Sequence, residues 1–223
     1  YDQFLQVRQG DGVVSLDEET LDELFVIGAQ LDKRLGYHNI SLGAEWQREY
    51  LQADRLDTDA ERDRESLFLQ DEFSIAPEHR LTLVPGIRFD RDSQFGEQWS
   101  PKLALRYDLA DEWVLRAGYG MGYRAPDFKQ LLLRFSNPAV GYRVDGNPDL
   151  RPERSTGFNA GLSWLPASGA EVTLSAYHNR VRDLIDIMQV ESTPVVFSYR
   201  NIAAASLAGI DLQTRFRPWK PLE

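Results

Sequence analysis

The sequence predicts an all-β protein, an antiparallel up-and-down transmembrane β-barrel, of which this chain supplies part: about ten strands of a larger barrel. Three observations predict it. Apolar and polar residues alternate along most of the 223 residues, and aromatic residues mark the ends of alternating segments. Short turns and long polar connections follow each other in alternation along the chain. Alternation with a period of two indicates a strand with one apolar face.

The clearest pair of strands runs from Trp99 to Tyr123. Its second member places one set of residues on a single side: Trp113, Leu115, Ala117, Tyr119, Met121 and Tyr123. The separation of Trp113 and Tyr123 corresponds to about 33 Å of strand, and a tilt of about 40° projects it to about 25 Å, the apolar band of an outer-membrane barrel. Trp113 and Tyr123 are therefore predicted to lie in the two aromatic girdles.

The connections between alternating segments are of two kinds. Short turns are predicted around Gly36, Pro77, Asp111 and Ser168, and long polar connections at 52–63, 91–98, 126–152 and 189–194. Long loops on one side and short turns on the other are typical of bacterial outer-membrane barrels, with the long loops outside the cell. The expected location is therefore the bacterial outer membrane.

Some positions interrupt the pattern. Asp71 lies on the apolar stripe of its strand, which predicts a bulge or a register change that turns it inward. Pro85 and Pro101 lie inside strands, where a missing donor is usual only at edges, strand starts or bulges. The segment from Tyr1 to Gln9 alternates poorly, and its expected strand rests on weaker evidence.

Composition excludes several classes of function. The formal net charge of −10 argues against nucleic acid as a partner, and the absence of cysteine excludes disulfides and cysteine zinc sites. The three histidines, His38, His79 and His178, form no metal-ligand spacing, and His178 continues an outward stripe. The acidic run at 54–63 is typical of a solvated loop. We therefore expect no enzyme activity, no cofactor and no metal site.

Two motifs carry a resemblance to a known family. The first is Tyr123-Arg124-Ala125-Pro126, and the second is Asn147-Pro148-Asp149-Leu150-Arg151-Pro152-Glu153. With the stretches 174–177, 199–202 and 209–212, they resemble the barrel domain of TonB-dependent outer-membrane receptors. The resemblance implies a plugged barrel of roughly 22 strands, so residues 1–223 are expected to be part of the barrel domain, with the plug domain absent.

The motifs admit two interpretations. Pro126 ends a strand because it lacks a donor, and Asn147-Pro148-Asp149 has turn chemistry, so both motifs serve as architecture. Alternatively, Arg124 and the loop that follows contact the ligand or the plug domain. That loop carries a short helical turn at 131–133 and a set of cations and aromatics suited to an anionic ferric siderophore: Lys129, Arg134, Tyr142 and Arg143.

The function that the resemblance implies is uptake of a scarce nutrient, energised by the TonB complex acting through the missing plug domain. A ferric siderophore is the first expectation and cobalamin the next. Haem receptors of the family usually carry a histidine between the two motifs, and 127–146 holds none. Lipid and lipopolysaccharide of the outer membrane are the other expected partners. Two alternatives remain: a small self-contained outer-membrane barrel, enzyme or pore, and a soluble β-sandwich binding module.

Overall fold

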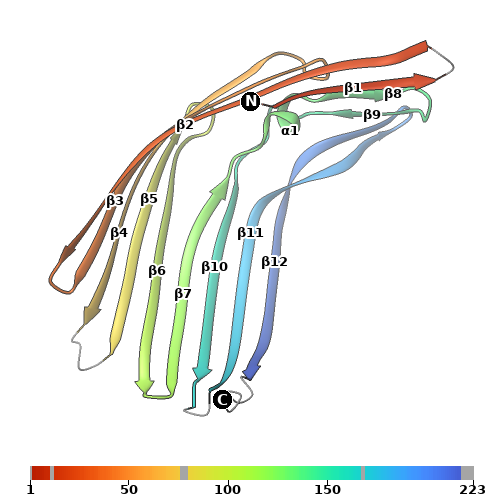
Figure 1. Cartoon of the computed structure of the whole chain (residues 1–223). Helices are drawn as coiled ribbons and strands as arrows, with labels where there is room; N and C mark the ends of the chain where they lie inside the picture. The colour runs from red at the N-terminus through yellow and green to blue at the C-terminus, as the bar shows by residue number, and fades with distance from the viewer. Residues whose placement is uncertain (1, 11–12, 76–79, 167–168, 217–223) are drawn as a thin grey trace, which may run out of the picture.

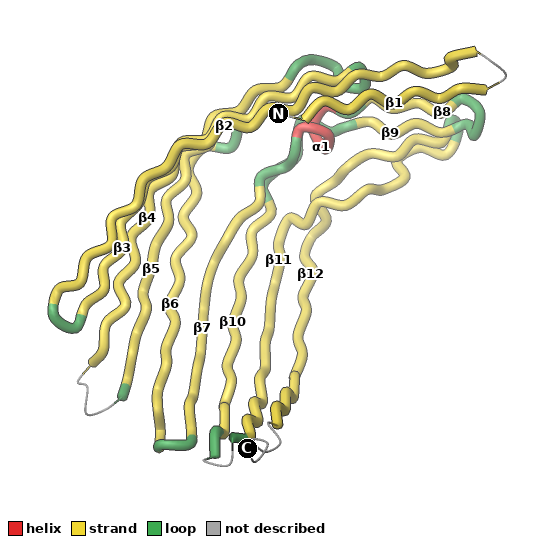
Figure 2. Tube along the Cα trace, in the orientation of Figure 1, coloured by secondary structure: helices red, strands yellow, loops and turns green. Residues whose placement is uncertain are grey.

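The computed structural model describes residues 2–10, 13–75, 80–166 and 169–216, with side chains from residue 19 onward. These residues form one curved, open sheet of 12 strands and a single short helix (Figures 1 and 2). Along the sheet the strands follow the order β1-β2-β3-β4-β5-β6-β7-β10-β11-β12-β9-β8. The described strands confirm the predicted antiparallel meander.

The elements are β1 (Asp2–Gly10), β2 (Val13–Leu35), β3 (His38–Ala53), β4 (Ala60–Ile75), β5 (Leu81–Asp92), β6 (Gly96–Ala110), β7 (Trp113–Arg124), α1 (Phe128–Leu132), β8 (Arg134–Asn137), β9 (Tyr142–Asp145), β10 (Glu153–Trp164), β11 (Ala170–Ser192) and β12 (Val195–Phe216). The short strands β8 and β9 and the helix α1 lie within the connection between β7 and β10. β9 pairs with β12 in parallel, whereas the other strand pairs are antiparallel.

The two faces of the sheet differ in chemistry. The outward face exposes large apolar side chains, among them Leu42, Leu67, Leu103, Leu174 and Leu212, of which Leu212 is 69% exposed. An uncovered apolar face of this extent suits lipid and not water. The inner face carries the charged and polar residues. Because no second sheet covers the apolar face in the described part of the chain, the β-sandwich alternative is excluded.

The long connections predicted at 91–98 and 189–194 are wrong. β5 and β6 pair as far as Asp92 with Gly96, and β11 and β12 as far as Ser192 with Val195, so each pair closes with a tight turn. Strands that extend beyond a membrane meet water on both faces, and their residues need not alternate. Polar composition therefore did not indicate a loop.

The bulge predicted at Asp71 is also wrong. The β4–β5 register has the same offset on both sides of it, from Gln70 with Gly86 to Phe73 with Leu83. Asp71 stays on the outward face near the end of β4, where its carboxylate lies 2.6 Å from Nδ1 of His38. The ladder skips the residues opposite Pro85 because proline has no N–H to donate.

The turn at Gly36-Tyr37 and the turn at Asp111-Glu112 are confirmed. The predicted turns at Pro77 and Ser168 lie outside the described residues, as does His79. The segment that alternates poorly forms β1 from Asp2 onward and pairs with β2, with one register shift between Arg8 and Gln9.

The girdle prediction is supported for Trp113, whereas Tyr123 lies where β6 and β7 separate. Trp113 lies across from Trp164 on the outward face, and their rings stack at 6.2 Å. Pairing between β6 and β7 runs only as far as Lys102 with Gly120. Beyond that point β7 leaves its neighbour. Tyr123, which stands opposite Arg154, lines both a pocket with charged residues of β4 and β5 and a groove with Trp99.

Candidate functional site

The two motifs meet at the end of the sheet from which residues 125–152 emerge, here called the outer end. The guanidinium of Arg124 donates to both carboxylate oxygens of Glu153, at 2.9 and 2.7 Å, and to Oε1 of Gln130 at 3.3 Å. Glu153 also accepts from the backbone N–H of Ile185 at 2.8 Å. One charge-assisted pair therefore joins β7, β10 and β11 where the chain leaves and re-enters the sheet.

Two asparagines hold the second motif against β11 and β12. Asn147 donates to the carbonyl of Tyr199 at 2.9 Å. The amide of Asn201 accepts from the N–H of Arg151 and donates to the carbonyls of Arg151 and Asp183. The Tyr199-Arg200-Asn201-Ile202 stretch thus recognises the backbone of the second motif, and these contacts give both motifs an architectural role.

The helix α1 covers the outer end of the sheet. Asp127 and Gln130 form a reciprocal capping box at its start, and Phe128 and Leu131 are buried. Phe128 packs against Leu51 and Ala60, and Leu131 packs against Leu150 and Ile185. A helical turn in this connection was predicted at 131–133, and the structure places it three residues earlier.

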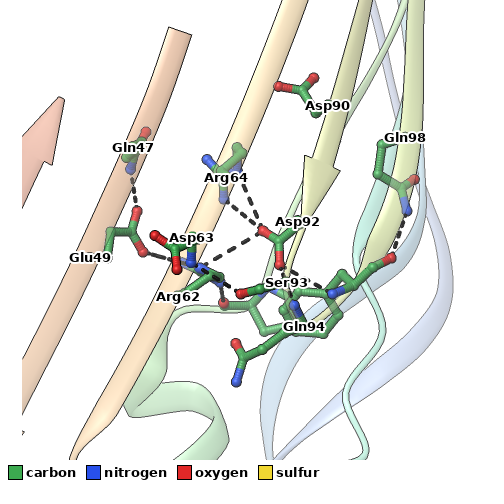
Figure 3. A network of polar contacts seen from close by, with 12 residues as sticks. Gln47, Glu49, Arg62, Asp63, Arg64, Asp90, Asp92, Ser93, Gln94 and Gln98 are labelled. Atoms are coloured by element: carbon green, nitrogen blue, oxygen red, sulfur yellow. Dashed lines mark hydrogen bonds and ion pairs between the residues drawn. The ribbon is translucent and has the colours of Figure 1, made fainter. Parts of the chain in front are cut away.

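A buried arginine on the inner face of the sheet binds the connection between β7 and β10 (Figure 3). Arg62 of β4 is 6% exposed. It pairs with Glu49, donates to the carbonyl of Pro126 at 2.8 Å, and lies over the ring of Phe128 at 4.9 Å. Pro126 is itself fully buried. Arg62 therefore binds the first motif through the backbone carbonyl of Pro126.

The same network continues to the turn between β5 and β6. The side chain of Asp92 is fully buried, pairs with Arg64 at 3.3 Å, and accepts from the N–H groups of Gln94 and Phe95 at 2.9 and 3.1 Å. Sequence reasoning missed this network. Its members sit on the polar stripes of three strands, and only the register brings them together.

Three of the predicted ligand residues lie in the β8–β9 hairpin. Arg134 stands opposite Asp145, and Arg143 stands opposite Ser136, so the two arginines share the exposed face of the hairpin. Arg134 pairs with Asp57, and Arg143 pairs with Asp145 at 2.9 Å. The hydrogen bond to Asp57 raises the pKa of Arg134, which keeps this guanidinium charged.

Aromatic side chains occupy the other face of the hairpin. Phe135 lies 5.9 Å from Tyr142, and Tyr142 meets Phe197 of β12 edge to face at 6.2 Å. The guanidinium of Arg55, from the β3–β4 connection, lies 4.6 Å over the ring of Phe135. The cations and aromatics that the sequence suggested as one set are therefore divided between two faces, with Arg55 joining the aromatic one.

Backbone pairing couples the β3–β4 connection to the β7–β10 connection. Leu56 and Leu133 form an isolated antiparallel bridge, and the N–H of Asp57 donates to the carbonyl of Leu132 at 3.1 Å. Residues 54–59, which the sequence suggested were a solvated acidic loop, therefore form part of the same outer structure. Arg55, a cation in an acidic run, was the signal that could have indicated this.

The other two predicted residues lie apart from the hairpin. Arg124 is held by Glu153, as described above. Lys129 on α1 lines a pocket of about 360 Å³ with Asp22, Leu24 and Glu49. The ammonium group of Lys129 makes no hydrogen bond or ion pair with any residue that the structure describes.

Across the described ranges, no group of three or more histidine, aspartate or glutamate side chains has the arrangement of a metal site. Within the same ranges, no helix is long and apolar enough to cross a membrane. His178 lies on the outward face opposite Phe158, as its place in the stripe predicted.

Comparison with known proteins identifies the architecture. The chain is 31% identical over 156 residues to the iron-regulated outer membrane virulence protein of Vibrio cholerae, covering 68% of this chain and 24% of that protein. It is 30% identical over 157 residues to the vitamin B12 transporter BtuB of Vibrio vulnificus, covering 70% and 23%. The chain thus spans about a quarter of the length of these relatives.

Solved structures share the fold. The siderophore receptor PirA of Pseudomonas aeruginosa superposes with a TM-score of 0.74 at 20% identity, over 88% of this chain and 39% of that one. The Serratia marcescens hemophore receptor HasR superposes with a TM-score of 0.71 at 18% identity, over 88% and 40%. The model of the TonB-dependent receptor-like β-barrel matches residues 2–222. The chain therefore belongs to the β-barrel family of TonB-dependent receptors, proteins of the bacterial outer membrane.

Proposed function

We propose that the protein carrying this chain captures a ferric siderophore at its outer mouth and imports it with energy from the TonB complex. In this proposal residues 1–223 belong to the barrel wall, and a plug domain outside them contacts the TonB complex. The protein acts as a transporter and not as an enzyme, and its outward face contacts outer-membrane lipid and lipopolysaccharide.

The observation that carries the ligand class is the coupling of two outer connections around cations and aromatics. Arg134 is 65% exposed and Arg143 is 48% exposed on one face of the β8–β9 hairpin, and the rings of Phe135, Tyr142 and Phe197 line the other. Exposed guanidinium groups attract an anionic chelate, and aromatic faces stack on its flat rings.

The roles of the predicted residues follow from their surroundings. We assign ligand contact to Lys129, Arg134, Tyr142 and Arg143. Arg124 positions the connection through Glu153, because both of its donor edges already have partners. The names of the relatives support a ferric siderophore as the ligand, since the virulence protein is described as iron-regulated and PirA as a siderophore receptor.

The test is binding of the intact protein, purified in detergent, to a panel of ferric siderophores, haem and cobalamin. At least one ferric siderophore should bind, and the double variant R134Q/R143Q should raise its Kd about tenfold or more, as expected for loss of charge-assisted hydrogen bonds. The control R106Q removes an arginine paired with Asp108 near the short turns and should leave Kd unchanged.

Cobalamin is the second candidate, because the similarity to BtuB covers 70% of this chain. Binding of cobalamin without binding of any ferric siderophore would replace the first proposal with this one. Cobalamin binding should also respond less to the loss of Arg134 and Arg143, because a neutral ligand gains little from exposed cations. Failure of every ligand in the panel would overturn both.

A further inference from the structure

Three arginines stand together on the outward face near the outer end of the sheet. The register places Arg154 of β10 directly opposite Arg182 of β11, and Arg180 follows two residues away on the same face. All three are exposed. None makes a hydrogen bond or an ion pair with another residue in the described ranges, whereas Arg48, on the outward face of β3, pairs with Asp63 at 2.8 Å.

This arrangement is unfavourable without an anion. Residues directly opposite each other in an antiparallel pair have Cβ atoms about 5 Å apart, and like charges there destabilise the pair. The next strand offers no carboxylate, because β12 places Ala204 opposite Arg182 and Ser206 opposite Arg180. The cluster therefore carries concentrated positive charge.

A groove lined by both aromatic and polar residues lies beside the cluster. Where β6 and β7 separate, a groove of about 510 Å³ is lined by Trp99, Tyr119 and Met121 together with Arg154 and Arg182. Glu97 also lines it and leaves the combined charge of the site positive. Trp99 is 59% exposed on this face, so the groove opens toward the surroundings of the sheet.

On the outward face, the residues that stand opposite one another across β7, β10 and β11 become apolar from the arginines toward the short turns. Phe158 stands between Tyr119 and His178, and the next row is Ala117, Ala160 and Ala176. The cations thus lie at one border of the outward apolar band. A ligand there would meet positive charge at one end and apolar surface along its length.

We propose that Arg154, Arg180 and Arg182 bind the phosphate groups of lipopolysaccharide in the outer leaflet, with an acyl chain in the adjoining groove. Guanidinium groups form bidentate hydrogen bonds with phosphate oxygens, and three cations match a headgroup with more than one phosphate. The lipid fits better than free phosphate because the cations adjoin a groove whose lining includes Trp99, Tyr119 and Met121. This inference rests on the outer-membrane placement and not on the identity of the transported ligand.

The experiment measures lipid binding by the intact protein in detergent, using native mass spectrometry with added lipid A. The probes are diphosphorylated lipid A, the same lipid without phosphates, phosphatidylglycerol, and inorganic phosphate as a competitor. The variants are the triple substitution R154Q/R180Q/R182Q, the charge-preserving R154K/R180K/R182K, and the control R48Q from the same face.

The wild type should bind diphosphorylated lipid A at least about tenfold more tightly than the dephosphorylated lipid. The glutamine variant should lose that preference, the lysine variant should keep most of it, and R48Q should keep all of it. Equal binding of phosphorylated lipid A to the wild type and to the glutamine variant would overturn the proposal. So would tighter binding of phosphatidylglycerol, or full competition by inorganic phosphate.

Folding of each variant is checked by heat-modifiable migration on gels, and the ferric siderophore panel provides a separate readout. Retained siderophore binding with lost lipid A preference supports the lipid site alone. A wild-type protein that binds no ferric siderophore but prefers diphosphorylated lipid A contradicts the proposed ligand. That result leaves the lipid site supported.

Discussion

Arg124, the last residue of β7, donates two hydrogen bonds to the carboxylate of Glu153, the first residue of β10. The chain between them leaves the sheet, forms α1 and the β8–β9 hairpin, and returns. The pair therefore closes the base of the connection that carries most of the proposed ligand contacts, and it explains physically why the two motifs occur together.

Breaking this pair should destabilise the connection more than the wall. E153Q removes the charge that holds Arg124 and weakens the acceptor for the N–H of Ile185, at a cost of about 2 kcal/mol in the free energy of unfolding. R124A and E153A combined should show a coupling energy of about 1 kcal/mol or more in a double-mutant cycle. The measurement is equilibrium urea unfolding of the intact protein.

The matched control is the double-mutant cycle of R106A and D108A. Arg106 also pairs with a carboxylate, that of Asp108, but its side chain is 51% exposed, and exposed pairs contribute about 0–1 kcal/mol. A coupling energy between Arg124 and Glu153 no larger than that of this control would contradict the structural role assigned to the motifs.

Loss of Arg62 should have a larger effect. R62A leaves Oε2 of Glu49 and the carbonyl of Pro126 without their donor and removes the cation over Phe128. Truncating one partner of a buried pair costs about 3–5 kcal/mol. R62K should recover little, because one ammonium group does not reproduce the planar fork. Limited proteolysis should show earlier cleavage within residues 125–152, and a protease-resistance profile equal to that of R48A would contradict this.

Gly146 should tolerate no side chain. A Cβ at this position would lie 2.6 Å from the backbone of Leu131 and Leu132, and its N–H donates to the carbonyl of Leu133 at 2.6 Å. Neither backbone can move without disturbing α1, so G146A should cost about 1–3 kcal/mol. G120A is the control, since its nearest neighbour would be 3.8 Å away. Thermal melts of the two variants should separate them, and coincident midpoints would count against the close packing.

The wall was predictable from sequence because each membrane-facing strand has one apolar face, and period two makes that face visible. Trp113 and its partners follow this rule. Beyond the membrane the alternation of apolar and polar residues is no longer required. The sequence pattern at 91–98 and 189–194 therefore predicted loops, although these segments are largely strand ends. The outer site was predictable only in composition. Strands of four residues, such as β8 and β9, give no period, and the parallel pairing of Tyr142 with Val195 joins residues far apart in sequence.

The non-local polar contacts could not be predicted for the same reason. Glu49, Arg62 and Asp92 belong to three strands, and each one alone looks like an ordinary inner-face residue. Asp71 shows the opposite failure. Its place on an apolar stripe suggested a bulge, but Nδ1 of His38 on the neighbouring strand β3 contacts Oδ2 of its carboxylate without any change of register. Its Oδ1 has no hydrogen-bond partner among the residues that the structure describes.

The assignment of faces can be tested at two residues of β12 that lie three positions apart and on opposite faces. Ile210 is 76% exposed on the outward face, between the row of Trp113 and the arginine cluster, whereas Gln213 lies on the inner face opposite Thr173. I210R should lower the free energy of unfolding in lipid vesicles by about 2–4 kcal/mol, the cost of a cation near the bilayer midplane. Q213R should change it by less than about 1 kcal/mol, because the inner face is polar. In detergent micelles, which deform around a charge, the penalty for I210R should shrink. Equal effects of the two substitutions in vesicles would mean that the outward face does not contact lipid.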